Sequence, residues 1–259
     1  MKILLISLLK RGSFIKMISL DRKFYVQNLS KKDKIVKIHD EEKQHLEVLR
    51  PSLKDKFWAT NGKGLDFLCK IIKMNKKFFE VEVLKVKENK KYPLYLHLFF
   101  GVTKRKKWEW LIEKATEMGV LEFTPLITKN NQQYAKGFYK EKKLERFKRK
   151  VVAAMKQSRR SFLPKINKPV KFSTLQNHDT KIKNSFVLSF DGIKWKKKDV
   201  EKSKKLNLIV GPEGGFTEKE VKILEDKDAK LRNIGIYTLK TETAALKAVS
   251  LLTYFKEDF

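Results

Sequence analysis

The pattern of apolar residues changes near residue 90, and this change limits the chain to two domains of different class. Before it, short runs rich in β-branched and aromatic residues follow one another, as in a small all-β domain. After it, apolar strands alternate with amphipathic helices, as in a parallel sheet covered by helices. Glu88–Pro93 is the expected linker between them.

The first domain is predicted to be a small β-barrel with one helix. Asn61-Gly62-Lys63-Gly64 is typical of a hairpin turn. A helix is expected over residues 40–50, ended by Pro51. Strands are predicted at residues 24–26, 34–38, 57–60, 65–72 and 78–86.

The second domain is predicted to be α/β. Gly119 suits a helix C-terminal cap, and Thr217 with Glu220 forms a capping box that begins a helix. Strands are predicted at residues 94–100, 122–127, 186–190 and 206–210. Further helices are predicted at residues 106–118, 140–161 and 244–254.

The formal net charge of +30 favours a polyanionic partner, because lysine and arginine that neutralise phosphates release counterions. Only nine of the 60 basic residues are arginine. An AT-rich genome gives the same lysine excess, so the charge alone supports nucleic-acid binding weakly.

Other features exclude several classes of protein. Cys69 is the sole cysteine, so no internal disulfide can form, which suits the cytoplasm. The apolar run Leu4–Leu9 is far shorter than the roughly 18 residues of a membrane helix, and no signal-peptide cleavage site follows. We expect no membrane partner. A ragged or over-extended N-terminus is favoured over a secretion signal, with Met17 as a second possible start. No metal site is expected, since the four histidines lack ligand-like spacing: His39, His45, His97 and His178.

The segment Leu208–Phe216 leads from an apolar strand into a glycine-rich turn before a helix. Glycines there let the backbone approach a ligand closely. The segment is not a Walker A motif, because Phe216-Thr217 stands where lysine is needed. It lacks the GxGxxG fingerprint too, so a ligand loop and a plain tight turn both remain open.

Two further segments lie at predicted helix ends. In Leu239–Leu246, Thr241 or Glu242 can cap the final helix, which is also ordinary helix-start chemistry. Gln157 and Arg160 are three residues apart and are expected to share a helix face. The alternative is a solvated basic helix end, where Arg160 only suits the helix dipole.

Taken together and in order, four motifs resemble the RsmE family of SPOUT-class methyltransferases, which act on N3 of a uridine in 16S ribosomal RNA. The resemblance runs from about Phe24 to Leu252 and includes His45–Arg50 in the first domain. The motifs are Glu113–Val120, Gln157–Arg160, Gly211–Phe216 and Thr241–Ala244.

This resemblance implies a PUA-like β-barrel at residues 20–88 and a SPOUT α/β domain at residues 94–259 with a deep trefoil knot, a rare topology. It further implies a homodimer and a bent S-adenosylmethionine cofactor held by knot loops. The implied cofactor-binding residues are Ser189, Gly211, Glu213, Gly215, Ile234, Gly235, Leu239, Thr243 and Ala244.

The implied reaction is methyl transfer to uracil N3 in 16S rRNA of the small ribosomal subunit. N3 carries a proton, and Glu213 is the candidate acceptor. Arg160 and Lys240 are candidates to stabilise the anionic uracil or to hold phosphate. The predicted RNA-binding residues are Arg22, Arg50, Lys104, Lys107, Gln157 and Arg160.

The chain departs from the family pattern at three places. Lys129-Asn130-Asn131 replaces an acidic residue, arginine and serine; Lys240 replaces arginine; and Arg159 replaces glycine. Two other functions stay open: a non-catalytic RNA-binding factor of ribosome assembly on the same fold, and a methyltransferase acting on another RNA position.

Overall fold

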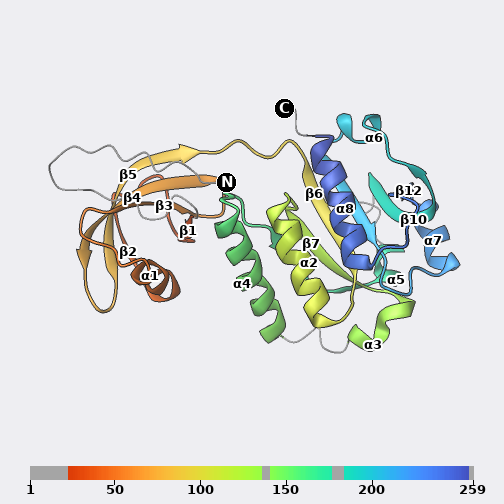
Figure 1. The fold of residues 1–259 in the computed structure, drawn as a ribbon, viewed down its shortest axis with the longest axis horizontal. Coiled ribbons are helices and arrows are strands. Elements are labelled where there is room, and N and C mark those ends of the chain that lie inside the picture. The colour runs from red at the N-terminus through yellow and green to blue at the C-terminus, as the bar shows by residue number, and fades with distance from the viewer. Residues whose placement is uncertain (1–22, 136–140, 177–183, 257–259) are drawn as a thin grey trace. The chain divides into compact units, whose positions relative to one another are not determined.

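The computed structural model describes residues 23–135, 141–176 and 184–256, and the chain divides into two compact units between Asn89 and Lys90 (Figure 1). Among the described residues, no helix is both long enough and apolar enough to cross a membrane. In the same residues, histidine, cysteine and acidic side chains form no group that could hold a metal ion.

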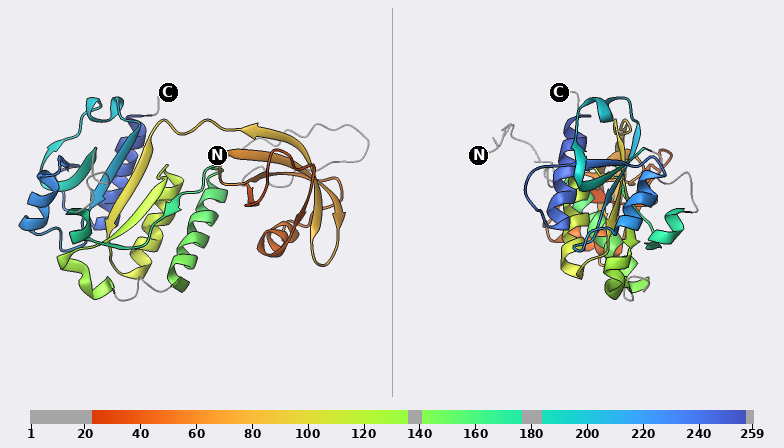
Figure 2. Two further views of the ribbon diagram at one scale, coloured as in Figure 1. Left: turned by 180° about the vertical axis from the view of Figure 1, so that it is seen from behind. Right: turned by 90° about the vertical axis from the view of Figure 1, so that its right-hand side faces the viewer.

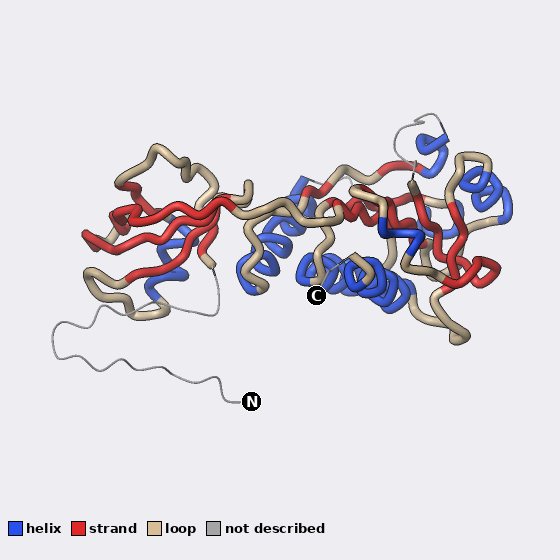
Figure 3. Tube along the Cα trace, turned by 90° about the horizontal axis from the view of Figure 1, so that it is seen from above, coloured by secondary structure: helices blue, strands red, loops and turns tan. Residues whose placement is uncertain are grey.

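The first unit is a curled half-barrel sheet with strand order β1-β3-β4-β5-β2 and one helix, α1 (Asp40–Glu47) (Figure 3). All neighbouring strands are antiparallel except β1 and β3. Phenylalanines from the strands fill its core. The strands are β1 (Phe24–Tyr25), β2 (Ile35–Ile38), β3 (Lys56–Thr60), β4 (Leu65–Met74) and β5 (Phe79–Glu88).

The predicted hairpin turn and helix of this unit are both present. The Asn61 side chain accepts hydrogen bonds from the backbone N–H groups of Lys63 and Leu65, at 2.9 and 3.3 Å. Gly62 takes the left-handed φ of 72° that the turn requires. Helix α1 ends at Glu47, three residues earlier than predicted, and Arg50 then adopts a φ of 49°.

The second unit contains a fully parallel sheet with strand order β12-β10-β11-β6-β7-β8, and β9 also pairs with β7. This confirms the α/β pattern predicted from the sequence. The strands are β6 (Tyr95–Gly101), β7 (Glu122–Ile127), β8 (Lys165–Ile166), β9 (Val170–Lys171), β10 (Ser185–Lys194), β11 (Lys205–Val210) and β12 (Lys230–Asn233).

Helices cover both faces of this sheet (Figure 2). Helices α2 (Arg105–Glu117), α4 (Glu141–Gln157) and α8 (Thr241–Tyr254) pack on one face, where Trp108 meets Phe147 edge to face. Helices α5 (Phe172–Gln176) and α7 (Glu218–Glu225) pack on the other. The remaining short helices are η1 (Lys129–Asn131), α3 (Gln132–Ala135) and α6 (Lys198–Glu201).

The C-terminal end of α4 corrects the prediction of a helix to residue 161. The helix ends at Gln157, and Arg159 adopts a left-handed φ of 56°. The Arg160 N–H then reaches back to the Met155 carbonyl at 3.0 Å, which closes the helix end. Because the chain turns at Arg159, the prediction that Gln157 and Arg160 share a helix face is wrong.

We expect Arg159→Gly to stabilise the protein by about 1 kcal/mol, since glycine enters the left-handed region without the steric cost that other residues incur. Thermal unfolding should show a rise in Tm of about 2–4 °C. Arg159→Ala is the control, because it removes the same charged side chain and keeps the Cβ. An equal rise in both variants would show that charge, and not backbone conformation, limits stability here.

Candidate functional site

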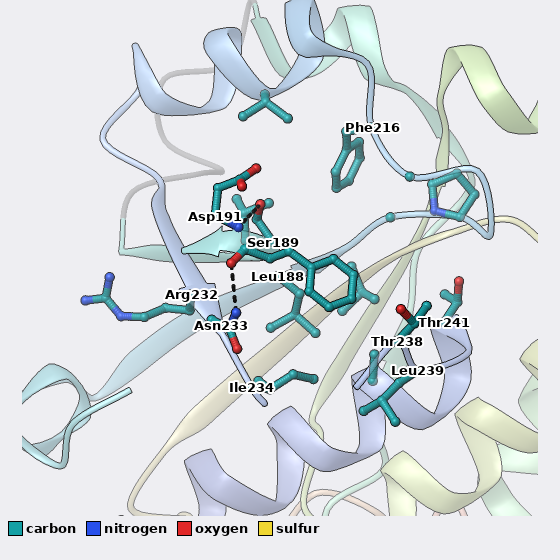
Figure 4. A pocket seen from close by; sticks show the side chains of 18 of the residues that line it. Leu188, Ser189, Asp191, Phe216, Arg232, Asn233, Ile234, Thr238, Leu239 and Thr241 are labelled. Carbon is teal, nitrogen blue, oxygen red and sulfur yellow. Dashed lines mark hydrogen bonds between the residues drawn. The ribbon is translucent and has the colours of Figure 1, made fainter. Parts of the chain in front are cut away.

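A pocket of 1070 Å³ lies in the second unit, where the parallel strands β11 and β12 end and where the register of β10, which lies between them, is interrupted. Three segments converge on it: the irregular stretch of β10 around residues 188–191 and the loops at residues 211–216 and 234–241 (Figure 4). Ligands of open α/β sheets bind at the carboxyl ends of such strands. The apolar side chains of Leu188, Phe216 and Leu239 approach it from three different segments, which suits a ligand with an aromatic ring.

Most residues predicted to bind the cofactor line this one pocket. The exception is Thr243, which is exposed in the first turn of α8 and does not line the pocket. Lys240, predicted to act in catalysis, lines the pocket from the residue before α8. The other predicted residues that line it are Ser189, Gly211, Glu213, Gly215, Ile234, Gly235, Leu239 and Ala244.

Glycines shape the loop after β11 for different reasons. Gly215 has a φ of +67°, and a Cβ built there would have no protein atom within 4 Å. A side chain at this residue would therefore be strained and would project into open space beside the pocket. At Gly211 a Cβ would lie 3.2 Å from the Phe216 ring, so glycine there allows that ring to fold against the loop.

Glu213, the candidate proton acceptor, forms an ion pair with Lys107 from the first turn of α2. The Glu213 hydrogen bond raises the pKa of Lys107, and the nearby Glu242 charge adds to this effect. The ammonium group therefore stays charged at neutral pH. The sequence predicted an RNA contact for Lys107; the structure places it at the pocket, beside the candidate acceptor.

The structure does not bring Arg160 to the pocket. Its side chain is buried, and its guanidinium donates hydrogen bonds to the carbonyls of Thr116, Gly119 and Val120 at the end of α2. It also donates to the Tyr92 hydroxyl at 3.1 Å, and burial lowers its pKa. These contacts support a role in closing the end of α2. The alternative considered from the sequence, a solvated basic end of its own helix, is also wrong, because Arg160 is buried.

The other predicted RNA-binding residues have separate locations. Arg50 is exposed in the first unit, while Lys104 and Gln157 are exposed in the second, at the start of α2 and the end of α4. Arg22 lies outside the described residues.

Sequence reasoning missed several residues of the site. Asn233 lines it from the end of β12, and its amide donates to the Phe190 carbonyl in β10 at 2.8 Å, which ties these two strands together beside the pocket (Figure 4). Asn130 does not line the pocket, but its amide donates a hydrogen bond to the Gly214 carbonyl in the loop after β11. The only sequence signal for Asn130 was its departure from the family pattern.

Comparison with known proteins extends over both units. The family model for an RNA methyltransferase domain matches residues 90–253, and the model for an RNA methyltransferase PUA domain matches residues 38–84. The protein named ribosomal RNA small subunit methyltransferase E from Aquifex aeolicus is 35% identical over 221 residues, covering 84% of this chain and 93% of its own. Its namesake from Bacillus subtilis is 29% identical over 238 residues, covering 85% and 90%.

A Legionella pneumophila structure, solved in complex with the bound cofactor SAM, superposes with a TM-score of 0.80 at 26% identity, covering 93% of this chain and 98% of its own.

Proposed function

Because the chain belongs to the RNA methyltransferase family that includes ribosomal RNA small subunit methyltransferase E, we propose that it transfers a methyl group from S-adenosylmethionine to N3 of a uridine in 16S rRNA. The pocket beside β10 and at the ends of β11 and β12 carries this proposal. Its volume, its apolar side chains and the open space at Gly215 suit a ligand of this size with an adenine ring.

The pocket loops would hold the cofactor. Leu188, Ile234 and Leu239 would supply apolar surface for the adenine, and Gly215 would let the backbone approach the ligand. When bound, S-adenosylmethionine supplies a methyl group already activated by the sulfonium charge. The protein therefore contributes chiefly positioning and electrostatics.

Glu213 is the proposed acceptor of the uracil N3 proton. In the proposed reaction the N3–H bond would break and the proton would move to a carboxylate oxygen. N3 would form a bond to the methyl carbon as the carbon–sulfur bond breaks, its electron pair would return to sulfur, and S-adenosylhomocysteine would leave. Lys107, next to Glu213, and Lys240, on the pocket wall, place positive charge where the uracil becomes anionic. N3 lies on the Watson–Crick edge, so the uridine must be unpaired or drawn out of its stack.

The rest of the proposal concerns assembly and partners. We propose that residues 20–88 form the RNA-binding domain and residues 94–259 the catalytic domain, with the pocket loops forming a trefoil knot. We further propose a homodimer that acts on the small ribosomal subunit in the cytoplasm. The excess of basic residues suits this substrate.

Methyl transfer to isolated small ribosomal subunits tests the reaction. With labelled S-adenosylmethionine, we expect label in 16S rRNA, and mass spectrometry of the digested RNA should identify 3-methyluridine. Subunits from a strain lacking this gene should be the better substrate, since their target is unmodified. Label on another nucleotide would favour the alternative target.

A non-catalytic assembly factor on the same fold is the competing function. The intact glycine loop and the pocket argue against it. Calorimetry with S-adenosylmethionine separates the two, because an assembly factor has no need to bind the cofactor.

A further inference from the structure

The glycine-rich loop after β11 is held by a turn from a distant part of the chain, residues 128–131, which we name the brace turn. We propose that Asn130 of the brace turn is a positioning residue that fixes this loop for S-adenosylmethionine. The inference rests on the proposed function, since it concerns the same pocket.

The Asn130 amide makes two contacts with the loop. Its Nδ2 donates to the Gly214 carbonyl at 2.8 Å and to the Gly215 carbonyl at 3.2 Å. A Cβ on Gly214 would lie 3.2 Å from the Cβ of Asn130, so glycine at this residue lets the asparagine side chain pack closely against the loop. Gly215 lines the pocket and Asn130 does not, so the asparagine acts on the loop from outside the pocket.

A second tie joins the brace turn to the helix that follows the loop. The backbone N–H of Lys129 donates to Glu220 Oε1 at 2.9 Å. The other oxygen of this carboxylate accepts from the backbone N–H of Thr217, also at 2.9 Å, within the capping box of α7. Glu220 is buried, so water does not compete for the hydrogen bonds by which its carboxylate links the brace turn to the start of α7.

The brace turn itself is well anchored. Asn131 is fully buried; it accepts from the Thr128 N–H at 2.8 Å and donates to the Leu126 carbonyl at 2.9 Å. The start of the loop is fixed separately, because Pro212 packs where a Cβ of Gly101 would stand. The loop is thus fixed at Pro212 and at Thr217. Between these two residues, the Asn130 side chain holds the carbonyls of Gly214 and Gly215.

The location of Asn130 separates positioning from general stability. Its side chain is exposed, so its removal creates no cavity in the core. Loss of its two hydrogen bonds would free the Gly214–Gly215 backbone, and binding of the cofactor would then have to order that backbone again.

The test compares Asn130→Asp and Asn130→Ala with the wild-type full-length protein. The aspartate keeps the shape but turns a carboxylate oxygen toward two carbonyls, and we expect the Kd for S-adenosylmethionine to rise about tenfold. Alanine removes the donor without repulsion, and we expect a rise of about threefold. In methyl-transfer assays the KM for the cofactor should rise while kcat at saturation stays near wild type.

Gln133→Glu is the matched control, because it makes the same amide-to-carboxylate change at an exposed residue nearby. It should bind the cofactor as wild type does, and all three variants should unfold within about 2 °C of wild type. Wild-type affinity in both Asn130 variants would overturn the inference alone, as would an equal loss in the control. Absence of cofactor binding by the wild type would overturn the proposed function, and the inference with it.

Discussion

Gly215→Val is expected to weaken binding of S-adenosylmethionine about a hundredfold or more. Gly215 has a φ of +67°, where a β-branched residue is strained by about 1–2 kcal/mol. The added side chain has no protein neighbour and enters open space at a residue that lines the pocket, where we propose that the cofactor binds. Strain and lost space act together, and a hundredfold loss corresponds to about 2.7 kcal/mol. Calorimetry measures the loss directly.

The matched control is Gly62→Val, which places the same residue type at a φ of 72° in the hairpin of the other unit. The valine would have similar backbone strain, but at a residue of the first unit that does not line the pocket. We expect it to lower the Tm by an amount similar to Gly215→Val while leaving cofactor affinity unchanged. If Gly215→Val binds S-adenosylmethionine normally, the cofactor does not occupy this pocket.

Arg160→Lys is expected to destabilise the second unit by about 2–4 kcal/mol, because a lysine cannot reach the four acceptors that the guanidinium contacts. The carbonyls of the buried residues Thr116 and Val120 and of the half-buried Gly119 would lose this donor. Thermal unfolding should show a fall in Tm of about 5–12 °C.

Arg159→Lys, at the exposed neighbouring residue, is the control and should leave the Tm nearly unchanged. Methyl transfer, measured well below the unfolding temperature, then separates the two roles of Arg160. A lower Tm with normal transfer supports the helix-end role. Lost transfer with an unchanged Tm would instead support the catalytic role predicted from the sequence.

Much of the fold followed from local patterns in the sequence. The capping box of Thr217 and Glu220 begins α7 as predicted, because its hydrogen bonds lie within one turn of the chain. The hairpin at Asn61–Gly64 likewise needs only its own residues. The end of α4 was missed, since Arg159 occupies the left-handed position at which glycine would have marked the helix end.

The contacts within the site were harder to predict from the sequence than the fold. The pocket loops were identified through a family resemblance, whereas the contacts that set their chemistry join distant segments. Lys107 reaches Glu213, and Asn130 reaches Gly214, across the fold, and no spacing rule predicts either pair. Strand β12 was missed because Lys230–Asn233 carries charged residues, although Arg232 is buried against Asp199.

The order of strands also governs how the chain must fold. Strand β6 pairs with β11 from Tyr95 to Phe100, so the centre of the sheet cannot form until the segment that begins at Lys205 has joined Tyr95. Closing so long a loop loses chain entropy before the new contacts repay it, and such long-range pairing slows folding. Until β11 arrives, β6 presents an unpaired apolar edge to other chains. The glycine-rich loop begins where β11 ends. We therefore expect the ability to bind the cofactor and the covering of the β6 edge to appear in the same kinetic step of folding.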